Sequence, residues 1–124
     1  MAVVNRCAVA VAPRRPMLDW SRPFMTREDM ESLGDEQSLY LLPIWDDEGE
    51  RQQRLEERWS AIFEAELDLW CRDRQLWPAP RDFAMFQDWF ELRFFPLVED
   101  LGGEPLRGFA VEEDFELSVR DSLR

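Results

Sequence analysis

Two charged residues, Glu66 and Arg93, stand where the surrounding pattern calls for a hydrophobic side chain. On a wheel of about 100° per residue, Glu66 falls in the middle of the apolar face of residues 50–74, and Arg93 does the same in residues 82–101. An unpaired charge is costly to bury. We therefore predict an ion pair between two helices. In the alternative, either charge reaches the rim of its helix and only its stem packs on aromatic rings.

Glu66 also has a chemical interpretation, because a carboxylate in an aromatic pocket can serve as a general base or a metal ligand. The composition narrows that chemistry, since the chain contains no histidine and no lysine. These absences exclude Ser-His-Asp and Cys-His nucleophiles, Schiff-base and P-loop lysines, and zinc sites that use histidine. Cys7 and Cys71 lie in apolar segments, and we interpret them as buried free thiols. We assign no catalytic residue, no metal ligand and no cofactor.

Acidic residues recur at spacings that metal sites use. Residues 46–57 place acids at four ligand positions of a calcium loop, but the sixth position, which needs glycine, is Arg51. We reject that loop. Two carboxylate pairs at helical spacing could hold magnesium or manganese, namely Glu64 with Asp68 and Asp88 with Glu91. They fall on the polar faces of the predicted helices, so solvated charge is the better interpretation.

Several aromatic side chains do not fit the apolar face of any predicted helix. An exposed cluster of such side chains would mark a site for a protein partner. The candidates for this surface are Trp20, Phe24, Trp45, Trp89 and Phe95. The alternative is that each one packs against the strands or the N-terminal segment.

The charge is unevenly distributed along the chain. The net charge is -12, but residues 1–24 carry four arginines and one acid, whereas residues 25–124 carry eleven arginines and twenty-six acids. A body this acidic repels nucleic-acid phosphates and attracts basic partners, so we expect no nucleic acid among its ligands. The simpler interpretation is that the charge serves solubility.

The first third of the chain predicts two strands with helical turns between them. Residues 3–11 are rich in valine and end at Pro13, which is typical of a strand. Residues 16–20 could form one helical turn, and Thr26 is placed to cap a short helix that ends before Gly34. The second strand, residues 38–45, is apolar on both faces, and Pro43 favours an edge position. Parallel and antiparallel pairing of the two strands both remain open.

The second half predicts two long helices, residues 50–74 and residues 82–101, separated by Pro78 and Pro80. Their short connection predicts an antiparallel hairpin. Pro96 should kink or break the second helix, because it removes a backbone hydrogen bond. After residue 103 the pattern weakens. Residues 115–119 alternate like a short strand, and we favour a solvated acidic tail.

These elements predict an α+β fold. A small sheet of two or three strands would pack on the antiparallel pair of long helices, with a short helix between the first two strands. We expect one domain over residues 1–106 and an acidic tail, partly disordered or a short strand, over residues 107–124. No apolar run is long enough to span a membrane, and residues 2–12 do not complete a signal peptide, so we expect a cytoplasmic protein that does not bind membranes.

Several short segments resemble a group of small bacterial proteins of uncharacterised function over residues 3–106. These segments are Val4-Asn5-Arg6, Met17–Trp20, Leu39–Pro43, Ile62–Trp70, Leu76-Trp77-Pro78 and Phe83–Phe90. The resemblance implies a bacterial source and an intact single domain. It brings no activity, cofactor or site.

The function favoured by the sequence is a non-enzymatic, acidic protein-interaction or regulatory protein that binds another protein or a second copy of itself. Two alternatives come from other classes. One is a carboxylate-dependent magnesium or manganese enzyme. The other is an acidic mimic of nucleic acid that inhibits a basic protein by occupying its groove.

Overall fold

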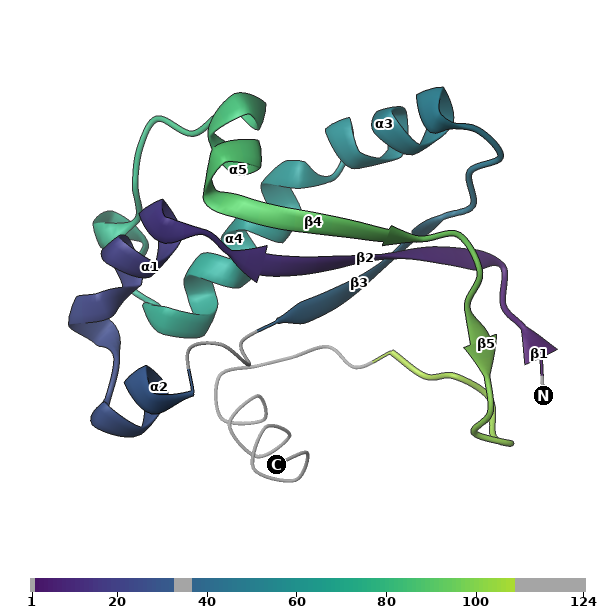
Figure 1. The fold of residues 1–124 in the computed structure, drawn as a ribbon, viewed down its shortest axis with the longest axis horizontal. Coiled ribbons are helices and arrows are strands. Elements are labelled where there is room, and N and C mark those ends of the chain that lie inside the picture. The colour runs from purple at the N-terminus through teal and green to yellow at the C-terminus, as the bar shows by residue number, and fades with distance from the viewer. Residues whose placement is uncertain (1, 33–36, 109–124) are drawn as a thin grey trace.

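The computed structural model describes residues 2–32 and 37–108 (Figure 1). Within these residues the chain is α+β, as the sequence predicts, and it contains five α-helices and small antiparallel sheets. The helices are α1 Arg15–Ser21, α2 Arg27–Glu31, α3 Glu48–Glu56, α4 Trp59–Trp70 and α5 Phe83–Trp89, with 3-10 turns η1 Arg22–Phe24 and η3 Arg74–Leu76. The strands are β1 Ala2–Val3, β2 Arg6–Pro13, β3 Ser38–Pro43, β4 Phe90–Phe95 and β5 Glu99–Asp100. None of the helices in these residues is long and apolar enough to cross a membrane.

The main sheet has three strands in the order β3-β2-β4, and both pairings are antiparallel. This answers the question of strand direction that the sequence leaves open. Val9 at the centre of β2 lies opposite Tyr40 of β3 and Phe94 of β4. β2 ends at Pro13, as predicted, and β3 with its Pro43 is an edge strand, where a missing backbone N–H costs no ladder bond. A separate two-stranded sheet pairs β1 with β5.

The two sides of the main sheet differ in character, because successive residues of a strand point to opposite faces. On one side, strand residues such as Val9, Val11 and Leu42 are buried against helices α1, α3, α4 and α5. The other side we call the open face. It consists of Arg6, Ala8, Ala10 and Ala12 of β2, Leu39 and Leu41 of β3, and Glu91, Arg93 and Phe95 of β4.

The open face corrects one sequence expectation. Residues 38–45 were expected to be buried on both faces, yet Leu39 is 61% exposed and Leu41 is 43% exposed. Tyr40 and Leu42, which alternate with them, face the helices. The physical reason is that helices α1, α3, α4 and α5 all pack on one side of the sheet, so within the described residues the strand is covered on that side.

The prediction of a second long helix is wrong beyond Trp89. Residues 83–89 form α5, but Phe90–Phe95 continue as strand β4, paired with β2. Pro96 contributes to this outcome, because a helix through it would lose a backbone hydrogen bond and bring its ring against the carbonyl of Leu92. Phe90, Leu92 and Phe94 also recur at period two, and they face the core while the residues between them face solvent.

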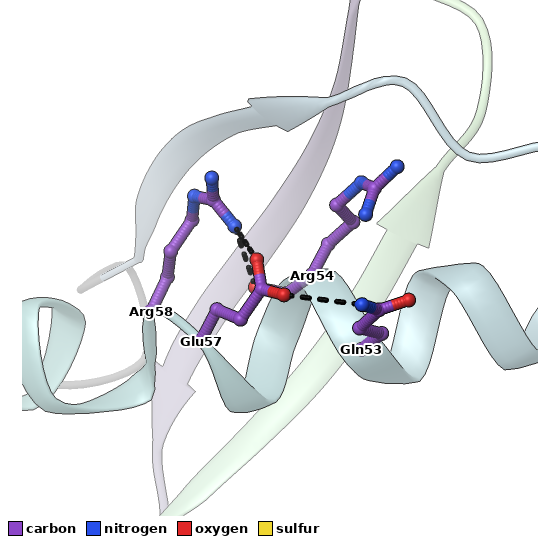
Figure 2. Close-up of polar contacts among 4 residues, drawn as sticks. All are labelled: Gln53, Arg54, Glu57 and Arg58. Atoms are coloured by element: carbon purple, nitrogen blue, oxygen red, sulfur yellow. Dashed lines mark hydrogen bonds and ion pairs between the residues drawn. The ribbon is translucent and has the colours of Figure 1, made fainter.

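The first long helix is divided in two, α3 and α4, at Glu57 and Arg58. Figure 2 shows the polar contacts at this break. The Arg58 guanidinium donates to the Arg54 carbonyl at 3.3 Å and to the Glu57 carboxylate at 3.0 Å, while Gln53 donates to the same carboxylate at 3.2 Å. Side chains thus satisfy part of the polar groups that the end of a helix leaves without intrahelical partners.

The core lies between the sheet and the helices and is dominated by aromatic rings. Phe63 of α4 is fully buried and lies 5.9 Å from Phe86, 5.6 Å from Trp89 and 5.3 Å from Phe90, measured between ring centroids. Edge-on and tilted arrangements of this kind add to the gain from area burial. Phe63 is therefore the side chain through which α4, α5 and β4 are joined.

Helix starts follow the sequence closely. Thr26 forms a capping box with Asp29, and Asp47 and Asp82 cap α3 and α5 through their carboxylates. The predicted stop of the short helix at Gly34 and the predicted strand or tail after residue 108 lie outside the described residues. The predicted cap at Thr26 is confirmed, because it depends on residues three positions apart in the chain.

The cap of α5 gives a first prediction. The Asp82 carboxylate accepts a hydrogen bond from the Met85 amide at 2.8 Å. Asp82→Ala is expected to lower the free energy of unfolding by about 1 kcal/mol, because one N-terminal amide loses its partner. Urea unfolding monitored by circular dichroism measures this loss. Asp88→Ala, which removes a carboxylate near the other end of the same helix, is the matched control and should not destabilise the protein.

Candidate interaction surface

Glu66 lies inside the helix layer, not in an open cleft. It belongs to α4, is 5% exposed, and its Oε2 accepts a hydrogen bond of 2.5 Å from the hydroxyl of Tyr40. Burial raises the pKa of Tyr40 well above its ordinary value, and the neighbouring Glu66 charge raises it further. The phenol therefore stays a hydrogen-bond donor, and the contact anchors α4 to β3.

Arg93 lies on the other side of the sheet. It belongs to β4, sits beside Ala10 of β2, and is exposed on the open face. Its guanidinium donates to the Gln37 side chain at 3.2 Å and lies 5.9 Å from the centre of the Phe95 ring. The premise of an interhelical ion pair is therefore wrong, because Arg93 belongs to a strand and the helical wheel does not apply to it.

A small hollow lies beside Tyr40, but it brings little chemistry. It has a volume of about 200 Å³ and is lined by Tyr40, Leu41, Leu42, Arg58, Ala61 and Ile62. Among residues 2–32 and 37–108, no three histidine, cysteine or acidic side chains gather where they could hold a metal ion. Glu64, one of the carboxylates at helical spacing, lies 3.4 Å from Arg81. The arrangement around Glu66 therefore supports a structural contact.

The five aromatic candidates do not form one patch. The Trp20 ring packs on Phe24 at 5.2 Å and its indole N–H donates to the Leu76 carbonyl at 3.2 Å. Trp45 packs edge-on against Phe94 at 5.8 Å. Trp89, already placed against Phe63, is also half-buried. Each of these indoles adjoins the core. Among these ring contacts, the one with a strand is that of Trp45, through Phe94 of β4.

Phe95 differs from the other candidates, because it projects from the open face and is 40% exposed. It lies opposite Ala8 of β2, and Leu41 of β3 lies opposite the same alanine from the other side. Leu39 extends the apolar surface along β3. Sequence analysis did not single out Leu39 and Leu41, although their alternation with Tyr40 and Leu42 was a usable signal.

Small side chains form the floor of the open face, and charged ones lie at both ends, Arg6 at one and Glu91 and Arg93 toward the other. Ala8 and Ala10 keep the centre low, so Leu41 and Phe95 stand above it. A shallow hollow of about 160 Å³ is lined by Ala10, Ala12, Gln37, Glu91 and Arg93. The surface therefore combines apolar projections, a recess and a few polar groups, which is the composition of a protein-binding surface.

Comparison of the chain with protein-family models, with curated proteins and with solved structures finds no match. The argument for a function therefore rests on the residues of this chain and on the geometry of the open face.

Proposed function

We propose that this chain is a non-enzymatic, cytoplasmic protein-interaction protein and that its partner binds the open face. The observation that carries the proposal is the exposure of Leu39, Leu41 and Phe95 together on the side of the sheet that the described helices of the core do not cover. Single exposed hydrophobic residues are ordinary, but a contiguous apolar patch rimmed by polar groups marks a binding surface.

In this proposal the helix layer supports the sheet and the open face binds the partner. The helix layer, which we take to hold α4 and α5 as an antiparallel pair, keeps the sheet rigid from behind. A rigid surface loses little conformational entropy when a partner binds. The net charge of -12 repels acidic macromolecules from most of the surface, so it contributes to the choice of partner.

Replacement of Phe95 tests the proposal. Phe95→Ala is expected to change the midpoint of thermal unfolding little, because the ring is already partly exposed, and to reduce binding of the partner protein. Trp89→Ala is expected to lower the unfolding midpoint clearly, because its ring packs on Phe63. The measurements are thermal unfolding of both variants and affinity purification from the native cell with wild type and Phe95→Ala as baits.

Leu39→Ser and Leu76→Ser form a matched pair for the same experiment. Leu76 is 54% exposed, much like Leu39, but lies on η3 and outside the open face. Leu39→Ser should reduce partner capture and Leu76→Ser should leave it unchanged. Equal effects of the two substitutions, or loss of folding in Phe95→Ala, would contradict the proposal.

A further inference from the structure

We infer that the partner on the open face is a second copy of this chain, with the two sheets stacked face to face. The inference rests on the proposed function of the open face and adds the identity of its occupant. Three observations carry it: the apolar character of β3 on both sides, the register of the three strands, and the charge of the face compared with the rest of the chain.

The first observation is that β3 is more apolar than a half-covered strand requires. Strands with hydrophobic side chains on both sides are typical of sheets buried between two layers. Within the described residues, the helix layer of one copy covers Tyr40 and Leu42 but leaves Leu39 and Leu41 exposed. A second sheet over Leu39 and Leu41 would supply the missing layer, and it would give these two leucines an apolar environment.

The register of the strands makes the face complementary to itself. Leu41 and Phe95 are level with each other, since both lie opposite Ala8 on either side of β2. A two-fold axis parallel to β2, midway between the sheets, places β3 of one copy over β4 of the other at the same level. Leu41 then meets Phe95 of the second copy, and the symmetry makes this contact twice.

The same axis matches the polar end of the face. Leu39 and Arg93 are level at Ala10, so Leu39 projects toward the hollow beside Arg93 of the second copy. Gln37 and Glu91 line this same hollow, so it offers polar groups to the second copy. An in-plane axis across the strands at the level of Ala10 would instead set Arg93 over Arg93. The axis along β2 sets Arg6 over Arg6 at the other end of the face, so the pairing of Leu41 with Phe95, and not charge, favours it.

Charge also separates the open face from the rest of the surface. Among the strand residues that define it, the face carries two arginines, Arg6 and Arg93, and one acid, Glu91, whereas the chain carries 27 acids and 15 arginines. These strand residues therefore add no net negative charge to the contact between two copies. Because each copy still carries a net charge of -12, association should strengthen as salt screens the remaining repulsion.

The size of the face sets the expected affinity. Three strands about 4.8 Å apart and six residues long at about 3.3 Å per residue cover roughly 300 Å² per copy. A standard stable interface buries about 800 Å² per partner. An interface this small belongs with weak and transient contacts, so the dimer is expected to be reversible and to form only at high protein concentration.

Sedimentation velocity of the full chain over a wide concentration range, at about 0.05 M and about 0.5 M salt, tests the inference. Wild type should shift from monomer to dimer with concentration, and more readily at the higher salt. Leu41→Asp and Phe95→Arg should each weaken self-association at least about tenfold. Leu76→Asp, an equally polar change outside the face, should leave it unchanged.

An equimolar mixture of the Leu41→Asp and Phe95→Arg variants tests the orientation. In the proposed arrangement the new acid of one copy faces the new arginine of the other, while the second Leu41–Phe95 contact stays native. The mixture should therefore form dimers more readily than either variant alone. Circular dichroism establishes that each variant is folded. If either variant is unfolded, Leu41→Ala and Phe95→Ala replace them, and their effects on the wild-type dimer should be non-additive.

Two outcomes overturn the inference. One is a wild-type chain that stays monomeric at every concentration and salt. The other is a dimer that the mixture does not restore or that Leu76→Asp weakens equally. If wild type is monomeric but Phe95→Ala still reduces capture of a different protein, the proposed function stands and only the second copy is excluded. If wild type is monomeric and Phe95→Ala captures other proteins as well as wild type does, the open face is not a binding surface.

Discussion

Replacing Phe63 with alanine is expected to lower the free energy of unfolding by about 3–5 kcal/mol. The ring is fully buried and contacts Phe86, Trp89 and Phe90, so its removal leaves a cavity between α4, α5 and β4. Whole domains are stable by about 5–15 kcal/mol, so this single change would remove a large share of the total. Urea unfolding followed by tryptophan fluorescence measures the shift in midpoint.

Two comparisons make this prediction specific. Phe63→Leu keeps most of the side-chain volume, so it should lower the free energy of unfolding clearly less than Phe63→Ala does. Phe83→Ala removes a ring of the same size that is only half-buried and packs on Phe86 at 6.4 Å, so its effect should also be smaller. A loss below about 1 kcal/mol for Phe63→Ala would contradict the central place that the structure gives this ring.

The stability of the protein is expected to fall at alkaline pH because of Tyr40. In the folded chain, burial and the Glu66 charge raise the pKa of this phenol far above its ordinary value of 10.0. The unfolded chain loses the proton near pH 10.0, whereas the folded chain keeps it. The protonated phenol therefore contributes its full stabilisation to the folded state below pH 10. Above pH 10 the free energy of unfolding falls by up to about 1.4 kcal/mol per pH unit.

The composition makes this titration simple to measure. Tyr40 is the sole tyrosine and the chain has neither lysine nor histidine, so the ultraviolet absorbance of tyrosinate reports this one phenol. The folded protein should show no tyrosinate at pH values where the urea-unfolded protein shows it fully. A normal tyrosinate titration in the folded chain would contradict the buried contact with Glu66.

Tyr40→Phe is the matched variant. It removes the hydroxyl that donates to Glu66 at 2.5 Å, and a hydrogen bond to a charged group contributes about 1.5–3 kcal/mol. The variant should therefore be less stable than wild type at neutral pH. It should lack the fall in stability that Tyr40 causes above pH 10.

The sequence by itself determined the features that depend on near neighbours in the chain. The end of β2 at Pro13 and the carboxylate cap at Asp82 follow from residue types at fixed spacing. The α+β class is equally accessible, because valine-rich and helix-periodic segments are distinct over most of the chain. Hydrogen bonds between residues close in the chain decide these features, so the sequence alone identifies the residues that form them.

Only the tertiary structure decided that residues 90–95 form a strand. Phe86, Phe90 and Phe94 fit a helix at spacing four, while Phe90, Leu92 and Phe94 fit a strand at spacing two, so the pattern alone serves both. The hydrogen bonds to β2, which lies about eighty residues earlier in the chain, select the strand. Distant pairing also placed Arg93 on the open face and Glu66 beside Tyr40.

The open face is the clearest case of this division. Leu39, Leu41 and Phe95 are far apart in the chain or hidden in longer apolar runs, and no spacing rule connects them. They meet because β3 and β4 flank β2 in one register, with every described helix of the core on the other side. The sequence determined that these side chains are hydrophobic. The fold decided that they face outward together, because the helices of the core cover the opposite side of the sheet.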